Sequence, residues 1–119
     1  MSDYRSLDAW NLAHATRLAV YRATAAYPAA EQFGLVAQTR RAASSIATNI
    51  AEGAGRGSNR DFGRFVSIAI GSTNETEDHL FLARELGYLP PDVWRDLSVS
   101  LERIRSMLSR LRSFLAGNG

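Results

Sequence analysis

The 119-residue sequence contains no cysteine, no lysine and only three prolines. The lack of cysteine excludes disulfides, thiolate catalysis and zinc-thiolate sites, and it favours a cytoplasmic location. All 14 basic residues are arginines, which reflects genome composition as readily as a need for bidentate phosphate contacts. No segment approaches the roughly 18 uninterrupted apolar residues of a membrane-spanning helix, so no membrane partner is expected.

The composition is that of an ordinary globular protein, with 45% hydrophobic and 22% charged residues. A chain of this length can bury its own core, which predicts a single domain over residues 1–119. The formal net charge of +2 is too small to identify a nucleic-acid-binding protein by itself.

The clearest helical segment runs from about residue 91 to 116, between Pro91 and Gly117. Apolar residues recur there at alternating steps of three and four, as in the seam of a helical bundle. Three further apolar residues, spaced by multiples of seven, form a second line that predicts contact with another subunit. The seam comprises Trp94, Leu97, Leu101, Ile104, Leu108, Leu111 and Leu115, and the second line comprises Val93, Met107 and Phe114.

Two more segments are predicted to form amphipathic helices. One starts near Ser6 and ends before Pro28, and the other begins at Ser58, a residue suited to capping a helix, and ends before Gly87. The face expected to point inward in the first is Leu7, Trp10, His14, Leu18, Tyr21 and Ala25; in the other it is Phe62, Phe65, Ala69, Ser72, Thr76, Leu80 and Ala83.

The remaining helix is expected from about Leu35 to Glu52, with a core face of mostly small side chains: Leu35, Thr39, Ala42, Ala43, Ile46 and Ile50. A polar stripe runs beside this face at helical spacing and consists of Gln38, Arg41, Ser45, Asn49 and Glu52. A structural role is the simpler interpretation, with Arg41, Asn49 and Glu52 partly buried and hydrogen-bonded within the chain or across a subunit interface. Replacing Arg41 or Glu52 by alanine would then cost about 1–3 kcal/mol. The alternative is a functional stripe in which Arg41 contacts phosphate. Four helices with short connections predict an all-α, antiparallel up-down-up-down four-helix bundle.

The stretch from Gln38 to Gly53 resembles the signature of four-helix-bundle proteins encoded in intervening sequences of bacterial large-subunit ribosomal RNA genes. This family is similar to the accessory variability determinant of diversity-generating retroelements, a basic, barrel-shaped pentamer that binds a reverse transcriptase and nucleic acid. The resemblance implies a homopentamer and little about chemistry. It extends to Val20-Tyr21, Pro28, Glu31, Phe33-Gly34-Leu35, Arg56, the Phe62–Phe65 stretch, Ile68-Ala69-Ile70-Gly71-Ser72, Glu75–Glu77 and Leu86-Gly87-Tyr88-Leu89.

Arg56, Arg60 and Arg64 follow the glycine-rich turn at intervals of four, and Arg40 is expected to approach them. Backbone amides near a helix start and clustered guanidinium groups suit a phosphate, which makes these four arginines a candidate nucleic-acid-binding set. A solvated arginine surface is the competing and simpler interpretation.

His14 and His79 are the only histidines, and neither has a second histidine at a metal-binding spacing. His14 is expected to be a hydrogen-bonded core residue, while Glu75 and His79 alone do not make a metal site. No serine has a recognisable companion base. We therefore expect no catalytic residue, no metal and no cofactor. The sequence predicts a non-enzymatic oligomeric protein that binds nucleic acid or a nucleic-acid-associated protein, with a purely protein-binding structural or regulatory module as the alternative.

Overall fold

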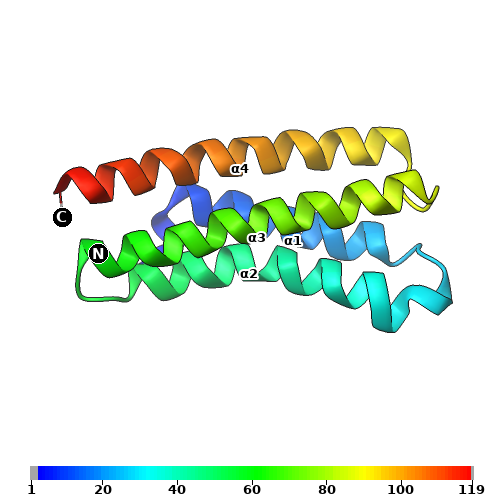
Figure 1. Cartoon of the computed structure of the whole chain (residues 1–119), viewed down its shortest axis with the longest axis horizontal. Coiled ribbons are helices and arrows are strands. Elements are labelled where there is room, and N and C mark those ends of the chain that lie inside the picture. Colours follow the sequence, from blue (N-terminus) through cyan, green and yellow to red (C-terminus); the bar gives the residue numbers. More distant parts are fainter. Residues whose placement is uncertain (1–2, 119) are drawn as a thin grey trace.

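The computed structural model describes residues 3–118 and confirms the all-α four-helix bundle (Figure 1). The helices pack in the order α1, α2, α3, α4, with α4 also contacting α1, and the bundle measures 45 × 23 × 20 Å. No strand occurs among residues 3–118, and none of their helices is long and apolar enough to span a membrane. The elements are η1 (Tyr4–Ser6), α1 (Asp8–Thr24), η2 (Ala29–Glu31), η3 (Gln32–Val36), α2 (Ala37–Ala54), α3 (Asn59–Glu85) and α4 (Pro91–Asn118).

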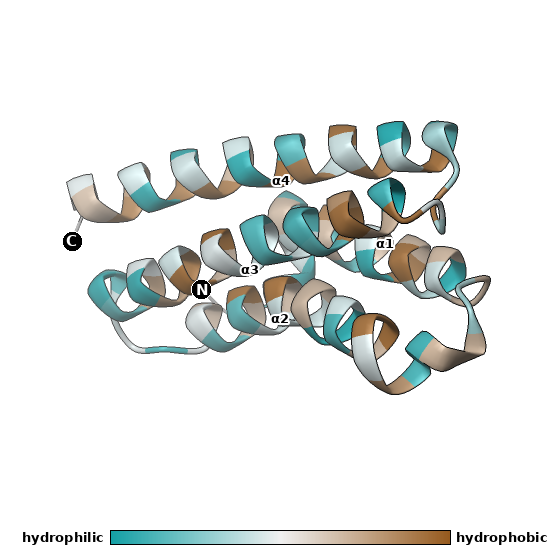
Figure 2. Cartoon of the chain, turned by 45° about the vertical axis from the view of Figure 1, so that its right-hand side comes forward, coloured by the Kyte–Doolittle hydropathy of each residue, from teal (hydrophilic) through white to brown (hydrophobic). Residues whose placement is uncertain are grey.

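The predicted seam of α4 forms much of the core. Leu101, Ile104 and Leu108 are fully buried, whereas Trp94 and Leu111 at the same spacing are half-buried. Figure 2 shows hydrophobic residues along the side of α4 that faces the other helices. The helix continues to Asn118, slightly beyond the predicted end, and Gly119 lies outside the described residues.

The predicted start and end of α3 are confirmed. Ser58 caps the helix, because its side chain accepts a hydrogen bond from the Asp61 backbone N–H at 3.1 Å. Gly87 follows the helix with φ of 81°, and the Tyr88 N–H donates back to the Ala83 carbonyl at 2.9 Å. This is the glycine-dependent turn that commonly ends helices.

The prediction for the buried face of α1 is wrong. The large residues expected inside lie outside, with Leu18 41% and Tyr21 43% exposed and with Trp10 and His14 only half-buried. Small side chains let helix backbones approach closely, so their burial places the bulkier stripe at the surface. The residues that α1 buries are Ala9, Ala13, Thr16, Val20 and Thr24.

The core face of α2 is also made of small side chains, here as predicted. Gly53 lies at a close approach of α2 to α3, since a Cβ atom added there would lie 2.8 Å from Phe62 Cδ1 and from Phe65 Cβ. Four buried threonines donate their hydroxyls to the carbonyl four residues earlier, as Thr39 does to Leu35 at 2.6 Å; the others are Thr24, Thr73 and Thr76. The buried hydroxyl of Thr16 has no hydrogen-bond partner among residues 3–118.

Candidate functional site

The turn between α2 and α3 brings Arg56 and Arg64 to one aromatic side chain. Both guanidinium groups lie 4.8 Å from the centre of the Phe65 ring, a distance suited to cation–π attraction. Each also has a nearby carboxylate: Arg56 Nη2 lies 3.1 Å from Glu52 Oε2, and Arg64 Nε lies 3.7 Å from Asp61 Oδ1. All four charged groups are exposed enough for these ion pairs to exchange for another anion at little cost.

An open groove of about 670 Å³ lies beside this cluster, between the start of α3 and the end of α4. Three arginines and one aspartate line it, so its charge favours an anion. Arg112 reaches the groove from α4 and donates from Nη1 to Ser67 Oγ at 3.3 Å. The residues around the groove are Asn59, Arg60, Asp61, Gly63, Arg64, Ser67, Arg112, Leu115 and Ala116.

Arg40 does not join this cluster, contrary to the sequence prediction. It lies near the other end of α2, 16 residues before Arg56, which corresponds to about 24 Å of helix. Its Nε donates to Thr24 Oγ1 at 2.9 Å and its Nη2 donates to the Tyr21 carbonyl at 3.1 Å. Arg40 thus satisfies a carbonyl at the end of α1. The sequence reasoning missed Arg112 instead, because that residue reaches the groove through the pairing of α3 with α4.

The polar stripe of α2 is hydrogen-bonded at its centre and exposed at its ends. Ser45 Oγ lies 2.9 Å from Ser72 Oγ of α3, and Asn49 Nδ2 donates to the Ser45 carbonyl and hydroxyl at 2.8 and 2.9 Å. Gln38 and Arg41 are exposed, and their side chains have no hydrogen-bond or ion-pair partner among residues 3–118. Glu52 is exposed as well, and Arg56 is its one ion-pair partner within the described part of the chain.

Within the single chain, Asn49 is half-buried and hydrogen-bonded, as the structural interpretation expects, whereas Arg41 and Glu52 are exposed. A contact of Arg41 or Glu52 across a subunit interface stays a prediction. Arg41 and Glu52 project from the part of α2 that faces away from the core, so neither leaves a buried polar group to satisfy. Their expected contribution to the stability of the single chain falls accordingly.

The second apolar line of α4 is also divided. Val93 and Met107 are half-buried and pack against the core of their own chain, whereas Phe114 is 62% exposed. The predicted contact with another subunit stays a prediction, and only Phe114 offers it a largely exposed side chain.

Each of the two histidines makes short-range contacts within its own helix, His14 in α1 and His79 in α3. The His14 ring stacks on Trp10 with 4.9 Å between centres, and its Nδ1 accepts a hydrogen bond from Arg17 Nε at 3.1 Å. His14 is half-buried, so the prediction that it is a core residue is wrong. His79 Nε2 lies 3.4 Å from Glu75 Oε2, which matches the spacing seen in the sequence. No cluster of three metal-binding side chains occurs within residues 3–118.

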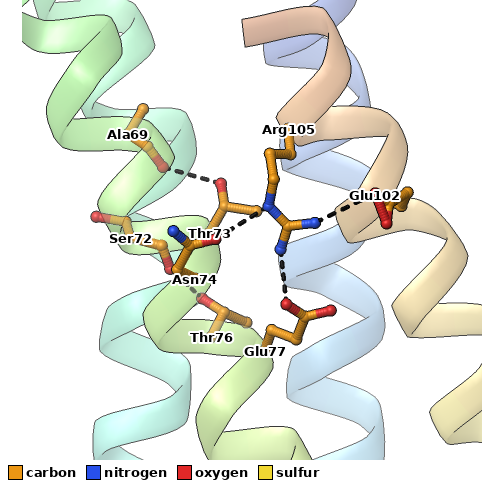
Figure 3. A network of polar contacts seen from close by, with 8 residues as sticks. All are labelled: Ala69, Ser72, Thr73, Asn74, Thr76, Glu77, Glu102 and Arg105. Carbon is orange, nitrogen blue, oxygen red and sulfur yellow. Dashed lines mark hydrogen bonds and ion pairs between the residues drawn. The ribbon is translucent and has the colours of Figure 1, made fainter. Parts of the chain in front are cut away.

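The strongest polar contact between helices centres on Arg105 of α4 (Figure 3). Its guanidinium contacts Glu77 Oε1 at 2.7 Å, Asn74 Oδ1 at 3.0 Å and Glu102 Oε1 at 3.5 Å. Because these groups satisfy one another, we assign the network to the packing of α4 on α3. Sequence reasoning missed it, since the helix pairing decides which polar residues meet.

Comparison with protein families identifies the chain. Residues 5–110 match the profile of the 23S rRNA-intervening sequence protein family, and the matched region covers α1, α2, α3 and most of α4. The chain belongs to this family. A comparison with curated proteins gave no match. In this 23S rRNA-intervening sequence protein, the matched region includes Arg56, Arg60 and Arg64 and ends before Arg112 and Phe114. The family description specifies no activity.

Proposed function

We propose that this chain is a non-enzymatic, cytoplasmic homo-oligomer, most simply a pentamer, that binds RNA or DNA through arginines near its α2–α3 turn. The observation that carries the proposal is the groove in which Arg60, Arg64 and Arg112 face one carboxylate, Asp61. Arg56 extends the same basic surface across Phe65. Such a surface suits a phosphate backbone without reading its sequence.

Oligomerisation gives a shallow groove a useful affinity. One set of exposed arginines binds phosphate weakly, but identical sets on a ring act together when one strand reaches several of them. The resemblance to a pentameric nucleic-acid-binding protein supports the same arrangement. Phe114 contributes an exposed aromatic side chain to assembly, so Phe114→Glu should weaken the oligomer more than it changes helix content.

The test of nucleic-acid binding is retention of labelled single-stranded RNA and DNA over a range of salt concentrations. The triple variant Arg60→Gln, Arg64→Gln, Arg112→Gln should bind at least about tenfold more weakly and depend less steeply on salt. The matched control replaces Arg95, Arg103 and Arg110, which are exposed on α4, and has the same net charge. Equal losses in both triples would show that overall charge, and not this groove, binds the strand.

A second candidate function has one specific observation in its favour. Arg56 and Arg64 already have carboxylate neighbours, and this suits a structural or regulatory module that recognises only protein. A wild-type protein that retains neither RNA nor DNA at low salt would favour that module. Light scattering tests the oligomer separately, and a monomer at micromolar concentration would refute the assembly.

A further inference from the structure

The outward surface of α1 carries an unexpected concentration of large side chains. Trp10, His14, Leu18 and Tyr21 recur at steps of four, four and three and form one stripe, called here the α1 stripe. The core behind them is filled by smaller residues of the same helix. Trp10 packs against the core of its own chain, whereas Leu18 and Tyr21 are 41% and 43% exposed, and neighbouring exposed apolar side chains of this kind mark a surface for another molecule.

A second exposed surface runs along α3, on the residues Ile68, Gly71, Glu75 and Leu82, called here the α3 face. Ile68 is 43% and Leu82 is 47% exposed. Gly71 lies within the helix, and a Cβ atom added there would meet nothing within 4 Å. A glycine at an exposed helical position destabilises the helix relative to alanine, and no contact of this chain explains it. Close approach of another molecule to the α3 backbone would explain the glycine at this position.

The two surfaces lie on parts of the chain with opposite charge. The helix that carries the α1 stripe, from Asp8 to Thr24, has two arginines and one aspartate. From Asn59 to Glu85 there are five carboxylates and three arginines. Electrostatic attraction therefore favours contact of the α1 side of one copy with the α3 side of another.

The two surfaces lie on different helices of the chain, α1 and α3. The α1 stripe borders α2, since Arg40 of α2 lies over the Tyr21 ring at 4.6 Å. On α3, Ser72 follows Gly71 in the sequence and is buried, with its hydroxyl oxygen 2.9 Å from that of Ser45 of α2. Contact between two different surfaces of identical chains is head-to-tail, and it closes into a ring when the surfaces are inclined to each other.

We propose that the α3 face, centred on Gly71, receives the α1 stripe of a second copy of this chain. The inference rests on the oligomer proposed above and names the surfaces that build it. Leu18 and Tyr21 supply the apolar contact, and the missing side chain at residue 71 lets them approach the α3 backbone.

The first test uses Gly71→Ala, whose two expected effects have opposite signs. In the background of Leu18→Glu, which should be monomeric, added helix propensity should raise Tm by about 3–5 °C. In the otherwise wild-type chain the same methyl group should weaken association at least about tenfold. Gly117→Ala is the control, because it adds a methyl group to an exposed helical glycine outside both surfaces. Unchanged association of Gly71→Ala would overturn the proposal.

The second test is complementation between two defective chains, Leu18→Glu and Gly71→Gln. Neither position is in the core, so both chains should keep their helix content by circular dichroism. Each alone should be monomeric, and an equimolar mixture should form a particle of two chains and nothing larger, because only one intact pair of surfaces remains.

The alternatives give different results. A mixture that stays monomeric, or single variants that keep the wild-type oligomer, would overturn this inference. If Phe114→Glu dissociated the oligomer while Leu18→Glu and Gly71→Gln did not, the proposal of an oligomer would stand and its interface would lie on α4. A monomeric wild-type chain would refute both proposals. If Leu18→Glu lost RNA binding but kept the oligomer, the α1 stripe would be a nucleic-acid surface.

Discussion

The helices α4 and α1 fill the same core in different ways. α4 buries large side chains such as Leu101 and Leu108 completely, whereas α1 buries Ala13 and Val20 and leaves Leu18 exposed. Hydrophobic stabilisation grows with the apolar area removed from water, so α4 contributes more of it per residue. The large side chains of α1 therefore remain available for contacts beyond the chain.

The largest expected effect tests this contrast directly. Leu101→Ala should destabilise the chain by about 2–5 kcal/mol, because it removes buried methyl groups and leaves a cavity. Leu18→Ala makes the same change at an exposed position and should cost less than about 1 kcal/mol at concentrations where the chain is monomeric. Urea unfolding measures both. Similar losses in the two variants would contradict the contrast between the helices.

Close packing of small residues should resist any added volume. Gly53→Ala would place a methyl group 2.8 Å from Phe62 Cδ1 and Phe65 Cβ, and the helices would have to move apart. We expect a loss of about 1–3 kcal/mol. Thermal unfolding of Gly53→Ala and Gly71→Ala under monomeric conditions provides the comparison, since the second change should stabilise the helix. An increase in Tm for Gly53→Ala would show that the α2–α3 contact is looser than described.

The polar stripe of α2 should show a smaller contrast along its length. Asn49→Ala removes hydrogen bonds to Ser45 in a half-buried setting and should cost about 1 kcal/mol. Arg41→Ala and Glu52→Ala should each change the free energy of unfolding of the monomeric chain by less than about 0.5 kcal/mol. These values replace the larger ones expected from sequence. Denaturant unfolding that ranks Arg41 above Asn49 would restore the original interpretation.

The smallest effect on stability at neutral pH is expected for Tyr27, which follows the end of α1. Its hydroxyl is buried without a hydrogen-bond partner among residues 3–118, and burial raises the pKa of Tyr27 from 10.0 to about 12. Stability from this shift is fully present below pH 10 and is lost as the pH rises towards 12, because the unfolded chain releases its proton first. Tyr27→Phe should be nearly neutral at pH 7 and should lose less stability than wild type between pH 10 and 12. Parallel alkaline unfolding curves for the two proteins would contradict this.

Sequence periodicity predicted the bundle and most of its helix limits, but it did not choose the correct face of α1. Ala9, Ala13, Thr16 and Val20 follow the same helical spacing as Trp10, His14, Leu18 and Tyr21. Hydrophobicity favours the larger set, whereas close helix approach favours the smaller one, and only the packed structure decides between them. Arg112 and Arg105 were missed for a related reason: the register between α3 and α4 determines their partners.

The unequal helix lengths have a consequence for local stability. α1 has 17 residues and α4 has 28, and Figure 1 shows α3 and α4 extending past the start of α1 at one end of the molecule. The last turns of α4 consequently lack a full ring of neighbours, and local opening there costs less free energy than at Leu101. Amide hydrogens after Arg110 should exchange with solvent sooner than those around Leu101. This end carries Arg112, so an anion bound in the groove would slow that exchange and report its own binding.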